Sequence, residues 1–272
     1  MNAPGYDLPL FVPATRPDRF EKALSHSPDA VIIDLEDAVA QNDKSAARDA
    51  LSGLADQINT AGKPVFVRVN ACRTEWFADD ISLCADLPLS GVILPQSESA
   101  DELAALRGQL APGALCLALI ETAAGLAAAR NIAASADRLV FGSVDYCTDL
   151  GCEHERAILL PSRLELVMAS RLADKPAPID GVTTDVSDEM LVLDDARHAV
   201  ALGFGGKLLI HPAQIASARK GFAPTGDQVA WAQKVLASSA GEAVALDGVM
   251  IDAPVLARAR AVVARAQLQK DA

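Results

Sequence analysis

Two short stretches, Leu117-Ala-Leu-Ile-Glu-Thr122 and Leu139-Val-Phe-Gly-Ser-Val-Asp145, decide the fold of this chain. Each begins as a run of apolar residues without polar alternation, which is typical of a parallel strand buried on both faces. Each leads to a single carboxylate, Glu121 in the first and Asp145 in the second. A carboxylate just beyond a buried parallel strand lies at the carboxyl edge of the sheet, where α/β proteins place their chemistry.

The same pattern recurs along the chain as eight strand-then-helix units. The expected strands are residues 8–13, 29–38, 64–70, 91–95, 117–122, 139–145, 177–182 and 206–212. The expected helices are residues 16–24, 43–58, 79–87, 99–110, 123–134, 160–172 and 188–202, then 227–239 and 254–269. Eight such units close into a barrel, and no GxGxxG motif favours the alternative, an open doubly wound sheet. We predict an α/β fold, a (β/α)₈ TIM barrel over residues 1–222 with a helical extension over residues 223–272.

The overall composition argues against several classes of protein. The net charge of −12 argues against a nucleic acid as partner. No apolar run reaches the roughly 18–20 residues of a membrane span, and the N-terminus lacks the basic start of a signal peptide. We therefore expect a cytoplasmic protein without a membrane partner. Neither a disulfide framework nor a zinc site is expected, because no CxxC pair occurs among the five cysteines, Cys72, Cys84, Cys116, Cys147 and Cys152.

Polar residues gather where the predicted strands end. They are Asp34, Glu36, Asp37, Arg68, Asn70, Gln96, Glu121, Asp145 and His211. In a barrel these ends share one rim, and burying a charge there without a partner costs several kcal/mol. Two acids from neighbouring strands could hold a hard divalent cation through their oxygens. Glu121 and Asp145 therefore predict a Mg²⁺ site, in which Mn²⁺ could substitute.

Each of these two acids also fits a structural role. Glu121 could cap the helix that follows, since a carboxylate stabilises a helix N-terminus by a few tenths to about 1 kcal/mol. Asp145 could be a turn residue. His211 could be a general acid or base, or a structural histidine that closes the last strand.

Arg68 is the most informative of the rim residues, because it places a permanent cation at the end of an aliphatic strand. Its guanidinium can bind a substrate carboxylate in a bidentate fork. The alternative is an internal ion pair with Glu36, Asp37 or Glu121. We expect Glu36 and Asp37 to orient Arg68 or to bind waters on the metal.

One metal, one fixed arginine and no serine or cysteine nucleophile beside a base together suggest enolate chemistry. A divalent ion can chelate a 2-oxo acid through its carbonyl and carboxylate oxygens, while Arg68 pairs with the charge. Making or breaking a carbon–carbon bond then needs one further base.

Taken together, five motifs resemble the citrate lyase β-chain family, within the HpcH/HpaI aldolase–citrate lyase superfamily that includes malyl-CoA and citramalyl-CoA lyases. The motifs are Leu10-Phe-Val-Pro13, Ile33-Asp-Leu-Glu-Asp-Ala-Val39, Val67-Arg-Val-Asn70, Phe141-Gly-Ser-Val-Asp145 and Gly203-Phe-Gly-Gly-Lys207 with Ile210-His-Pro212. The resemblance runs from about Leu8 to Ala261, in the family's order.

The resemblance implies a barrel that assembles as a homotrimer or a hexamer. It implies Mg²⁺ at Glu121 and Asp145, with a substrate carboxylate on Arg68. Family members cleave or form 3-hydroxyacyl-CoA thioesters, giving a 2-oxo acid and an acyl-CoA. Residues 248–252 would belong to a C-terminal lid over a neighbouring subunit's site, with Asp252 as the catalytic base. The residues alone indicate an N-cap at Asp252, which is compatible with that role.

Two positions depart from the family pattern. Asp7-Leu8 stands where many relatives have Arg-Ser, and Gln96 stands where a lysine is usual, which would remove two cations near the mouth. Arg16 and Lys22 are then the candidate contacts for the CoA phosphates.

The expected function is a Mg²⁺-dependent carbon–carbon lyase of the citryl-, malyl- or citramalyl-CoA type. The alternatives are a pyruvate-type class II aldolase without CoA, and a partner-dependent citrate lyase-like subunit that binds an acyl-carrier protein. The acyl chain, the 2-oxo acid and the direction of the reaction are left open.

Overall fold

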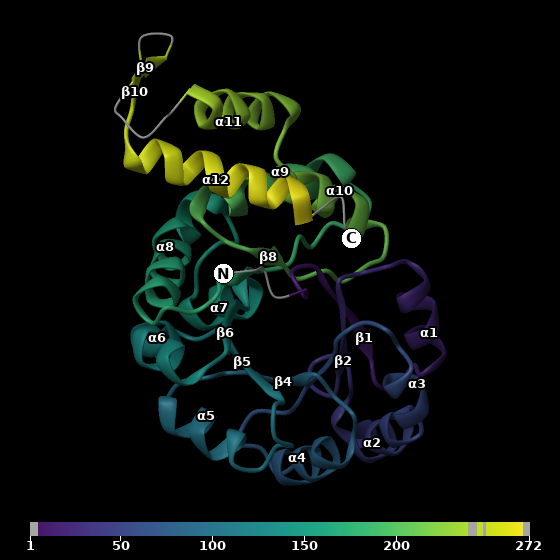
Figure 1. The fold of residues 1–272 in the computed structure, drawn as a ribbon. Helices are drawn as coiled ribbons and strands as arrows, with labels where there is room; N and C mark the ends of the chain where they lie inside the picture. Colours follow the sequence, from purple (N-terminus) through teal and green to yellow (C-terminus); the bar gives the residue numbers. More distant parts are fainter. Residues whose placement is uncertain (1–4, 239–243, 247–248, 269–272) are drawn as a thin grey trace. The chain divides into compact units, whose positions relative to one another are not determined.

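Eight parallel strands form a single sheet in sequence order in the computed structural model, which describes residues 5–238, 244–246 and 249–268 (Figure 1). The strands are β1 Pro9–Pro13, β2 Ala30–Asp34, β3 Val65–Arg68, β4 Gly91–Leu94, β5 Leu115–Ile120, β6 Arg138–Phe141, β7 Ile179–Asp180 and β8 Gly206–Lys207. Just beyond β8, Leu209 closes the ring against β1: its carbonyl accepts a hydrogen bond from the Phe11 N–H at 2.9 Å, and it forms a parallel bridge with Leu10. The predicted barrel is confirmed, and the open sheet is excluded.

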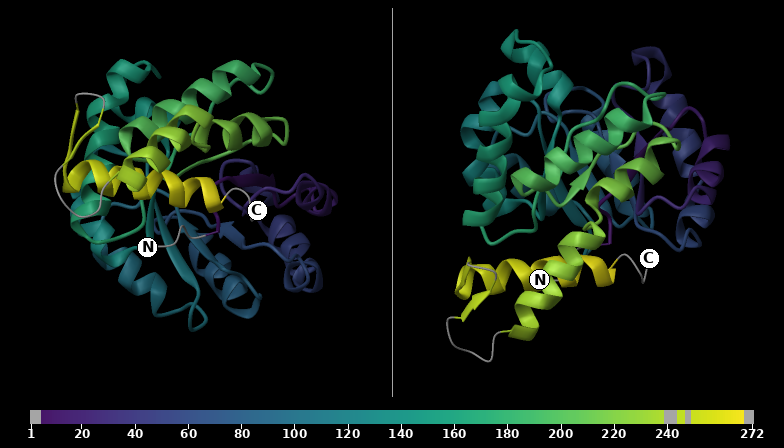
Figure 2. Two further views of the ribbon diagram at one scale, coloured as in Figure 1. Left: turned by 45° about the horizontal axis from the view of Figure 1, so that its top comes forward. Right: turned by 90° about the horizontal axis from the view of Figure 1, so that it is seen from above.

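Helices lie outside this ring, as Figures 1 and 2 show from three sides. They are α1 Asp18–Ser25, the 3₁₀ helix η1 Gln41–Asp43, α2 Lys44–Ser52, α3 Ala55–Asn59, α4 Phe77–Asp86, α5 Ala100–Arg107, α6 Ala123–Ser135, α7 Ser143–Leu150, α8 Arg156–Leu172 and α9 Glu189–Leu202. Side chains cap the N-termini of two of these helices. Ser99 and Glu102 form a capping box at the start of α5, and the Thr122 hydroxyl accepts a hydrogen bond from the Gly125 N–H at 2.9 Å at the start of α6.

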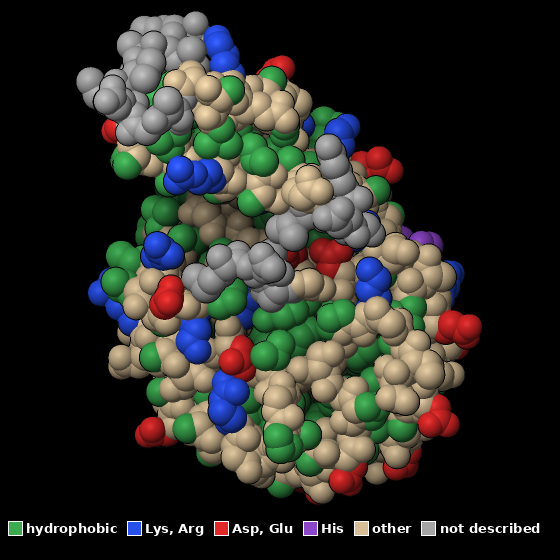
Figure 3. All heavy atoms as spheres, in the orientation of Figure 1, with side chains coloured by type: hydrophobic (Ala, Val, Ile, Leu, Met, Phe, Trp, Pro, Cys, Tyr) green, Lys and Arg blue, Asp and Glu red, His purple; other side chains and the backbone are tan. Residues whose placement is uncertain are grey.

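The interior of the ring is packed with apolar side chains from every second strand position. Its buried cluster consists of Tyr6, Ala30, Ile32, Phe66, Ile93, Leu117, Leu119, Val140, Ile179 and Leu208. Figure 3 shows hydrophobic side chains at the centre of the ring and charged ones spread over the surrounding helices. The barrel is therefore a filled core, as in other proteins of this fold, which place their ligands at the strand ends.

The helices differ from expectation at two places. The single helix expected over residues 43–58 divides into α2 and α3, because the chain turns at Gly53 and Leu54, and glycine is about 1 kcal/mol less favourable than alanine inside a helix. Helix α7 was not expected, since it is too short for a clear apolar period. It ends at Gly151, whose φ of +71° is the left-handed cap that glycine adopts without strain.

Position 7 lies at the amino ends of the strands, opposite to the mouth. The Asp7 Oδ1 accepts a hydrogen bond from Arg138 Nη1 at 2.8 Å, at the first residue of β6. Arg138 is only 1% exposed and lies over the Tyr6 ring. The expectation that an acid at position 7 removes a cation near the mouth was therefore wrong.

The chain divides into two compact units, residues 1–218 and 219–272, and α10 (Gln214–Phe222) spans the division. The second unit contains α11 (Gly226–Ser238), α12 (Ala253–Leu268) and an antiparallel pair, β9 (Val244–Leu246) and β10 (Val249–Ile251). Its buried residues are Ala232, Val235, Ile251, Ala259 and Val262.

Both C-terminal helices were expected, whereas the β pair was not. Of the expected lid segment 248–252, Gly248 lies outside the described residues. A division at residue 222 and packing of the extension on a neighbouring subunit stay predictions. No helix among the described residues is both long and apolar enough to cross a membrane.

Candidate functional site

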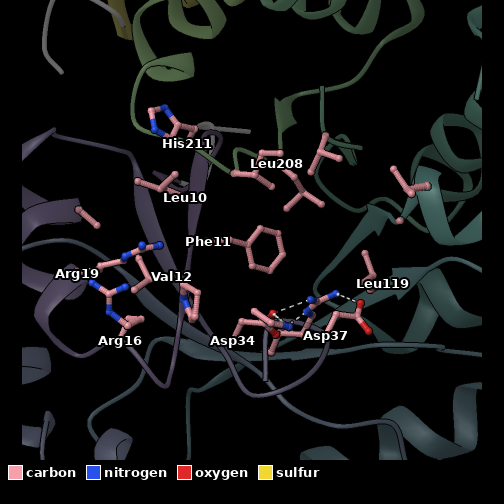
Figure 4. Close-up of a pocket in the computed structure, with 18 of the residues that line it drawn as sticks. Leu10, Phe11, Val12, Arg16, Arg19, Asp34, Asp37, Leu119, Leu208 and His211 are labelled. Carbon is pink, nitrogen blue, oxygen red and sulfur yellow. Dashed lines mark hydrogen bonds and ion pairs between the residues drawn. The ribbon is translucent and has the colours of Figure 1, made fainter. Parts of the chain in front are cut away.

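A cavity of about 900 Å³ opens at the carboxyl ends of the barrel strands, within the usual size of small-molecule sites. Its charged lining residues are Arg16, Asp18, Arg19, Lys22, Asp34, Asp37, Arg68, Glu121 and Asp145. Figure 4 shows Phe11 between His211 on one side and Asp34 and Asp37 on the other, with Arg16 and Arg19 together on a further side. The rest of the lining is mainly apolar, so the polar groups define where a ligand can bind.

Arg68 and Asp34 form a buried fork at the base of this cavity. They end β3 and β2 and are direct partners across the two strands. Nε and Nη2 of Arg68 donate to the two Asp34 carboxylate oxygens at 2.8 and 2.7 Å. Burial acts to lower the pKa of Arg68, but Asp34 and the neighbouring acids outweigh it and hold that pKa above its ordinary value. The guanidinium is thus fixed in place and permanently charged.

The third guanidinium nitrogen of Arg68, Nη1, faces two more acids, which belong to the loop after β2. Glu36 Oε2 is 2.8 Å away, without the alignment of a hydrogen bond, and Asp37 Oδ2 accepts at 3.3 Å. The internal ion pair considered from the sequence is therefore present with Glu36 and Asp37, and no ion pair of the described residues joins Arg68 to Glu121. Asp34 was missed as the main partner, although the strand register would have identified it.

Glu121 follows β5 and is 3% exposed. Its Oε1 accepts the Gln96 N–H at 2.7 Å, and Gln96 holds a left-handed φ of +45°, which costs roughly 1–2 kcal/mol for a residue with a Cβ. Its Oε2 is buried and has no hydrogen-bond donor among the described residues. Gly142 makes room for it, since a Cβ built there would lie 2.5 Å from that oxygen. The site therefore holds one buried carboxylate oxygen that no donor among the described residues satisfies.

Asp145 lies in the first turn of α7 instead of directly at a strand end, and lines the same cavity. Burial, then the charge of Asp37, raises its pKa, and Arg68 opposes the shift. Burial, then Glu36, raises the pKa of Glu121 well above its ordinary value, with Asp145 adding to the effect. Burial also raises the pKa of Glu36 to about 8. These carboxyls repel one another and need a cation to be charged together.

The donor set fits a hard divalent ion. Glu121 supplies an unpartnered buried oxygen and Asp145 a second carboxylate on the same cavity. Within the described ranges, no group of three or more His, Cys, Asp and Glu is arranged to enclose a metal. Mg²⁺ is commonly bound by one or two carboxylates, with water or substrate in its other coordination positions, whereas zinc prefers histidine and cysteine ligands.

Without metal, the protein should lose stability as the pH rises. The folded pKa of Glu36, about 8, lies above its ordinary 4.5, so its stabilising contribution is complete below about pH 4.5 and is lost as the pH rises through 8. We expect the Tm in EDTA to fall between about pH 5.5 and 8.5, and the Tm gain on adding Mg²⁺ to grow with pH. Scanning calorimetry measures both. Glu36→Gln should flatten the slope in EDTA; an unchanged slope in that variant contradicts the assignment.

Three cations from the first helical segment form another wall of the cavity, Arg16, Arg19 and Lys22. Arg16 also donates to Asp18 at 2.8 Å from both Nε and Nη2. Arg16 and Lys22 were expected from the sequence, whereas Arg19 was missed, although Arg19 and Lys22 are three residues apart and so lie on one side of α1.

His211 also lines the cavity. Its Nδ1 accepts the Ala213 N–H at 3.2 Å, so the neutral ring carries its proton on Nε2. The structure thus brings His211 to the site without choosing between its two expected roles.

Asp252 belongs to the second unit. Its Oδ1 accepts the Val255 N–H at 3.1 Å at the start of α12, so the N-cap indicated by the sequence is present. The side chain is exposed. The barrel therefore assembles Arg68, Glu36, Asp37, Glu121 and Asp145 in one place, and Asp252 is not among them.

Comparison with known proteins adds to this geometry. Residues 8–212 match the family model HpcH/HpaI aldolase/citrate lyase. A citrate lyase subunit beta-like protein of Mycobacterium tuberculosis is 37% identical, over 94% of each chain. The citrate lyase subunit beta of Escherichia coli K12 is 32% identical, over 95% of this chain and 92% of the other. A crystal structure of CitE from M. tuberculosis in complex with magnesium, acetoacetate and coenzyme A has a TM-score of 0.85 and 35% identity, over 97% of this chain and 99% of that one.

Proposed function

The chain belongs to the HpcH/HpaI aldolase/citrate lyase family, and from this membership and the cavity we propose that it is a Mg²⁺-dependent carbon–carbon lyase acting on a CoA thioester. The observation that carries the proposal is the bare Oε2 of Glu121, buried beside Gly142 in a cavity that Asp145 and Arg68 share. The related CitE, which binds magnesium, acetoacetate and coenzyme A, supports the same ligand classes here. The substrate would be a 3-hydroxyacyl thioester of the citryl, malyl or citramalyl type.

Glu121 and Asp145 would hold the metal. When bound, Mg²⁺ supplies Lewis-acid stabilisation of charge that develops on a substrate oxygen. Arg68 keeps its guanidinium fixed through Asp34, so one Nη2 hydrogen remains to donate to an anionic substrate group. Because this donor is already fixed, it does not have to reorient as charge develops on the substrate. Such preorganised donors lower the activation barrier of the reaction.

Asp252 is proposed as the base for the substrate hydroxyl. In cleavage it takes the hydroxyl proton, the bond between the hydroxyl-bearing carbon and the α-carbon of the thioester breaks, and the bond electrons pass to that α-carbon, which gives the thioester enolate. Protonation of that enolate gives the acyl-CoA, and the former alcohol carbon becomes the carbonyl of the 2-oxo acid. The exposed carboxylate of Asp252, which makes a single capping bond, supports this role.

Arg16 and Lys22, together with Arg19, are proposed contacts for the CoA phosphates. All three line the wall of the cavity and project from the same short segment. Clustered cations can attract a polyanion even on a chain with a net charge of −12.

A complementation experiment tests whether the proposed base acts in trans, between subunits of the proposed trimer or hexamer. Glu121→Gln and Asp252→Asn should each be inactive. Co-expressed in equal amounts with different tags, they should regain about a quarter of wild-type activity, since each site then needs one intact residue from each of two subunits. A base acting within its own subunit predicts no recovery at all.

The proposed reaction is tested by a substrate panel. Citryl-CoA, malyl-CoA and citramalyl-CoA are assayed for release of the 2-oxo acid, with Mg²⁺, with EDTA, and with Mg²⁺ added back. We expect one thioester to be cleaved, activity to vanish in EDTA and to return with the metal. Cleavage of free 4-hydroxy-2-oxo acids without CoA would instead support an aldolase, and cleavage only of thioesters on an acyl-carrier protein would support a partner-dependent subunit.

A further inference from the structure

Lys44 is a buried cation behind the acidic loop, and the proposed mechanism does not use it. It is the first residue of α2 and is 5% exposed. Its Nζ donates to the carbonyl oxygens of Leu35 and Glu36, at 2.7 and 2.8 Å, and lies 5.3 Å from the centre of the Trp76 ring. Lys44 does not line the cavity.

A buried ammonium group is costly, which makes this placement informative. Burial lowers the pKa of Lys44, and the charges of Asp34 and Glu36 act against that shift. Among the described residues, no carboxylate forms an ion pair with Lys44; its partners are two peptide oxygens and an aromatic ring. An apolar side chain at this position would avoid the free-energy cost of burying an ammonium group. The presence of a lysine with two hydrogen bonds to carbonyls therefore calls for an explanation.

The two carbonyls belong to the loop that carries Glu36 and Asp37, two of the three acids facing Arg68. This loop leaves the sheet after Asp34, whose carboxylate accepts the N–H groups of Glu36 and Ala38 at 3.0 and 3.1 Å. Asn70 adds one bond to the Leu35 oxygen at 3.1 Å. The Glu36 peptide oxygen also accepts the Val39 N–H at 3.0 Å, and Lys44 is the charged donor that joins it to the Leu35 oxygen.

We propose that Lys44 is a positioning residue of the lyase site: by holding the Leu35 and Glu36 carbonyls from behind the barrel, it fixes the Glu36 carboxylate against Arg68 and beside Glu121. Without it, the Leu35 oxygen would keep its Asn70 bond and the Glu36 oxygen its Val39 N–H bond, but the link between the two carbonyls would be lost. The Glu36 carboxylate would then be held less firmly against Arg68 Nη1. The inference rests on the proposed function only in naming the reaction.

The test compares Lys44→Met with Arg48→Met. Arg48 lies on the same helix and pairs with Asp79 and Asp80 at 3.3 and 3.1 Å, so its removal also loosens α2. Both loop carbonyls keep their Lys44 bonds in that variant, and Asp80 keeps the bonds from Asn70. Mn²⁺ affinity is measured by titration calorimetry, kcat and KM by the thioester assay, and stability by urea unfolding.

Lys44→Met should weaken Mn²⁺ binding and lower kcat by roughly 10- to 100-fold, as outer partners of metal ligands commonly do, with KM changed less than about threefold. Arg48→Met should lose stability without changing either readout, and Lys44→Arg, which keeps a cationic donor, should recover part of both. Equal Mn²⁺ affinities in the two methionine variants would overturn the proposal. If the wild type binds Mn²⁺ but cleaves no thioester, the proposed reaction fails, while the Mn²⁺ comparison still decides the role of Lys44.

Discussion

Glu121→Gln is expected to abolish Mg²⁺-dependent turnover while leaving the barrel folded. The carboxamide keeps the length of the side chain and an oxygen for the Gln96 N–H, but it removes the negative charge that would bind the ion. Loss of one preorganised electrostatic group at a reacting centre commonly costs about 10²–10³-fold in rate, and loss of the ion itself should cost at least as much. Steady-state kinetics with Mg²⁺ titration measures the effect.

The same substitution should not destabilise the metal-free protein. Burial and Glu36 raise the pKa of Glu121, so the folded protein disfavours its charged form, and a neutral amide avoids that conflict. We expect the Tm in EDTA at about pH 8 to equal or exceed that of the wild type. Glu98→Gln is the matched control, because Glu98 pairs with Arg73 outside the cavity and should keep full activity. Retained turnover in Glu121→Gln would refute the metal assignment.

Arg68→Met is expected to give the largest loss of stability of any single change at the site. It leaves Asp34, whose side chain is 2% exposed, without the cation that binds both its oxygens. Breaking a buried pair by removing one partner typically costs about 3–5 kcal/mol. The loss should be greater at about pH 8 than at pH 5, since more of the facing carboxyls are then charged. Urea unfolding at the two pH values measures it, and activity should disappear as well.

Two controls show whether the pair itself is responsible. Arg130→Met removes an arginine that pairs with Glu165 on the outer helices and is mostly exposed, so its urea midpoint should not move measurably. The double variant Arg68→Met with Asp34→Asn should recover part of the lost stability, because it removes the unpaired Asp34 charge and keeps a side-chain oxygen for the loop N–H groups. If Arg68→Met is no less stable than Arg130→Met, the buried fork does not stabilise the barrel as argued here.

The sequence identified the site residues better than it identified their partners. From the sequence, Arg68 was expected either to bind a substrate carboxylate or to form an internal ion pair. The structure contains the ion pair, and Asp34 is its main partner. That choice depends on the register between β2 and β3, which places the last residues of the two strands side by side. Apolar runs predict that strands are neighbours but do not fix their register to the residue.

Features built from backbone geometry were the hardest to see from the sequence. The bond from the Gln96 N–H to Glu121, the space beside Gly142 and the two carbonyls held by Lys44 each depend on where the folded backbone places its polar groups, which a pattern of residue types does not show. Helix α7, which carries Asp145, was missed because eight residues give too few turns for an apolar period.

By itself, the sequence determined the barrel, its family and the set of acids at its mouth, because strand period, helix period and motif order are local properties of the chain. Only the tertiary structure decided which of those acids neutralise Arg68 and which one keeps a bare oxygen. The reason is physical: the protonation and pairing of a buried carboxyl depend on its desolvation and on charges within a few ångströms, and both are set by packing between strands that are far apart in the sequence.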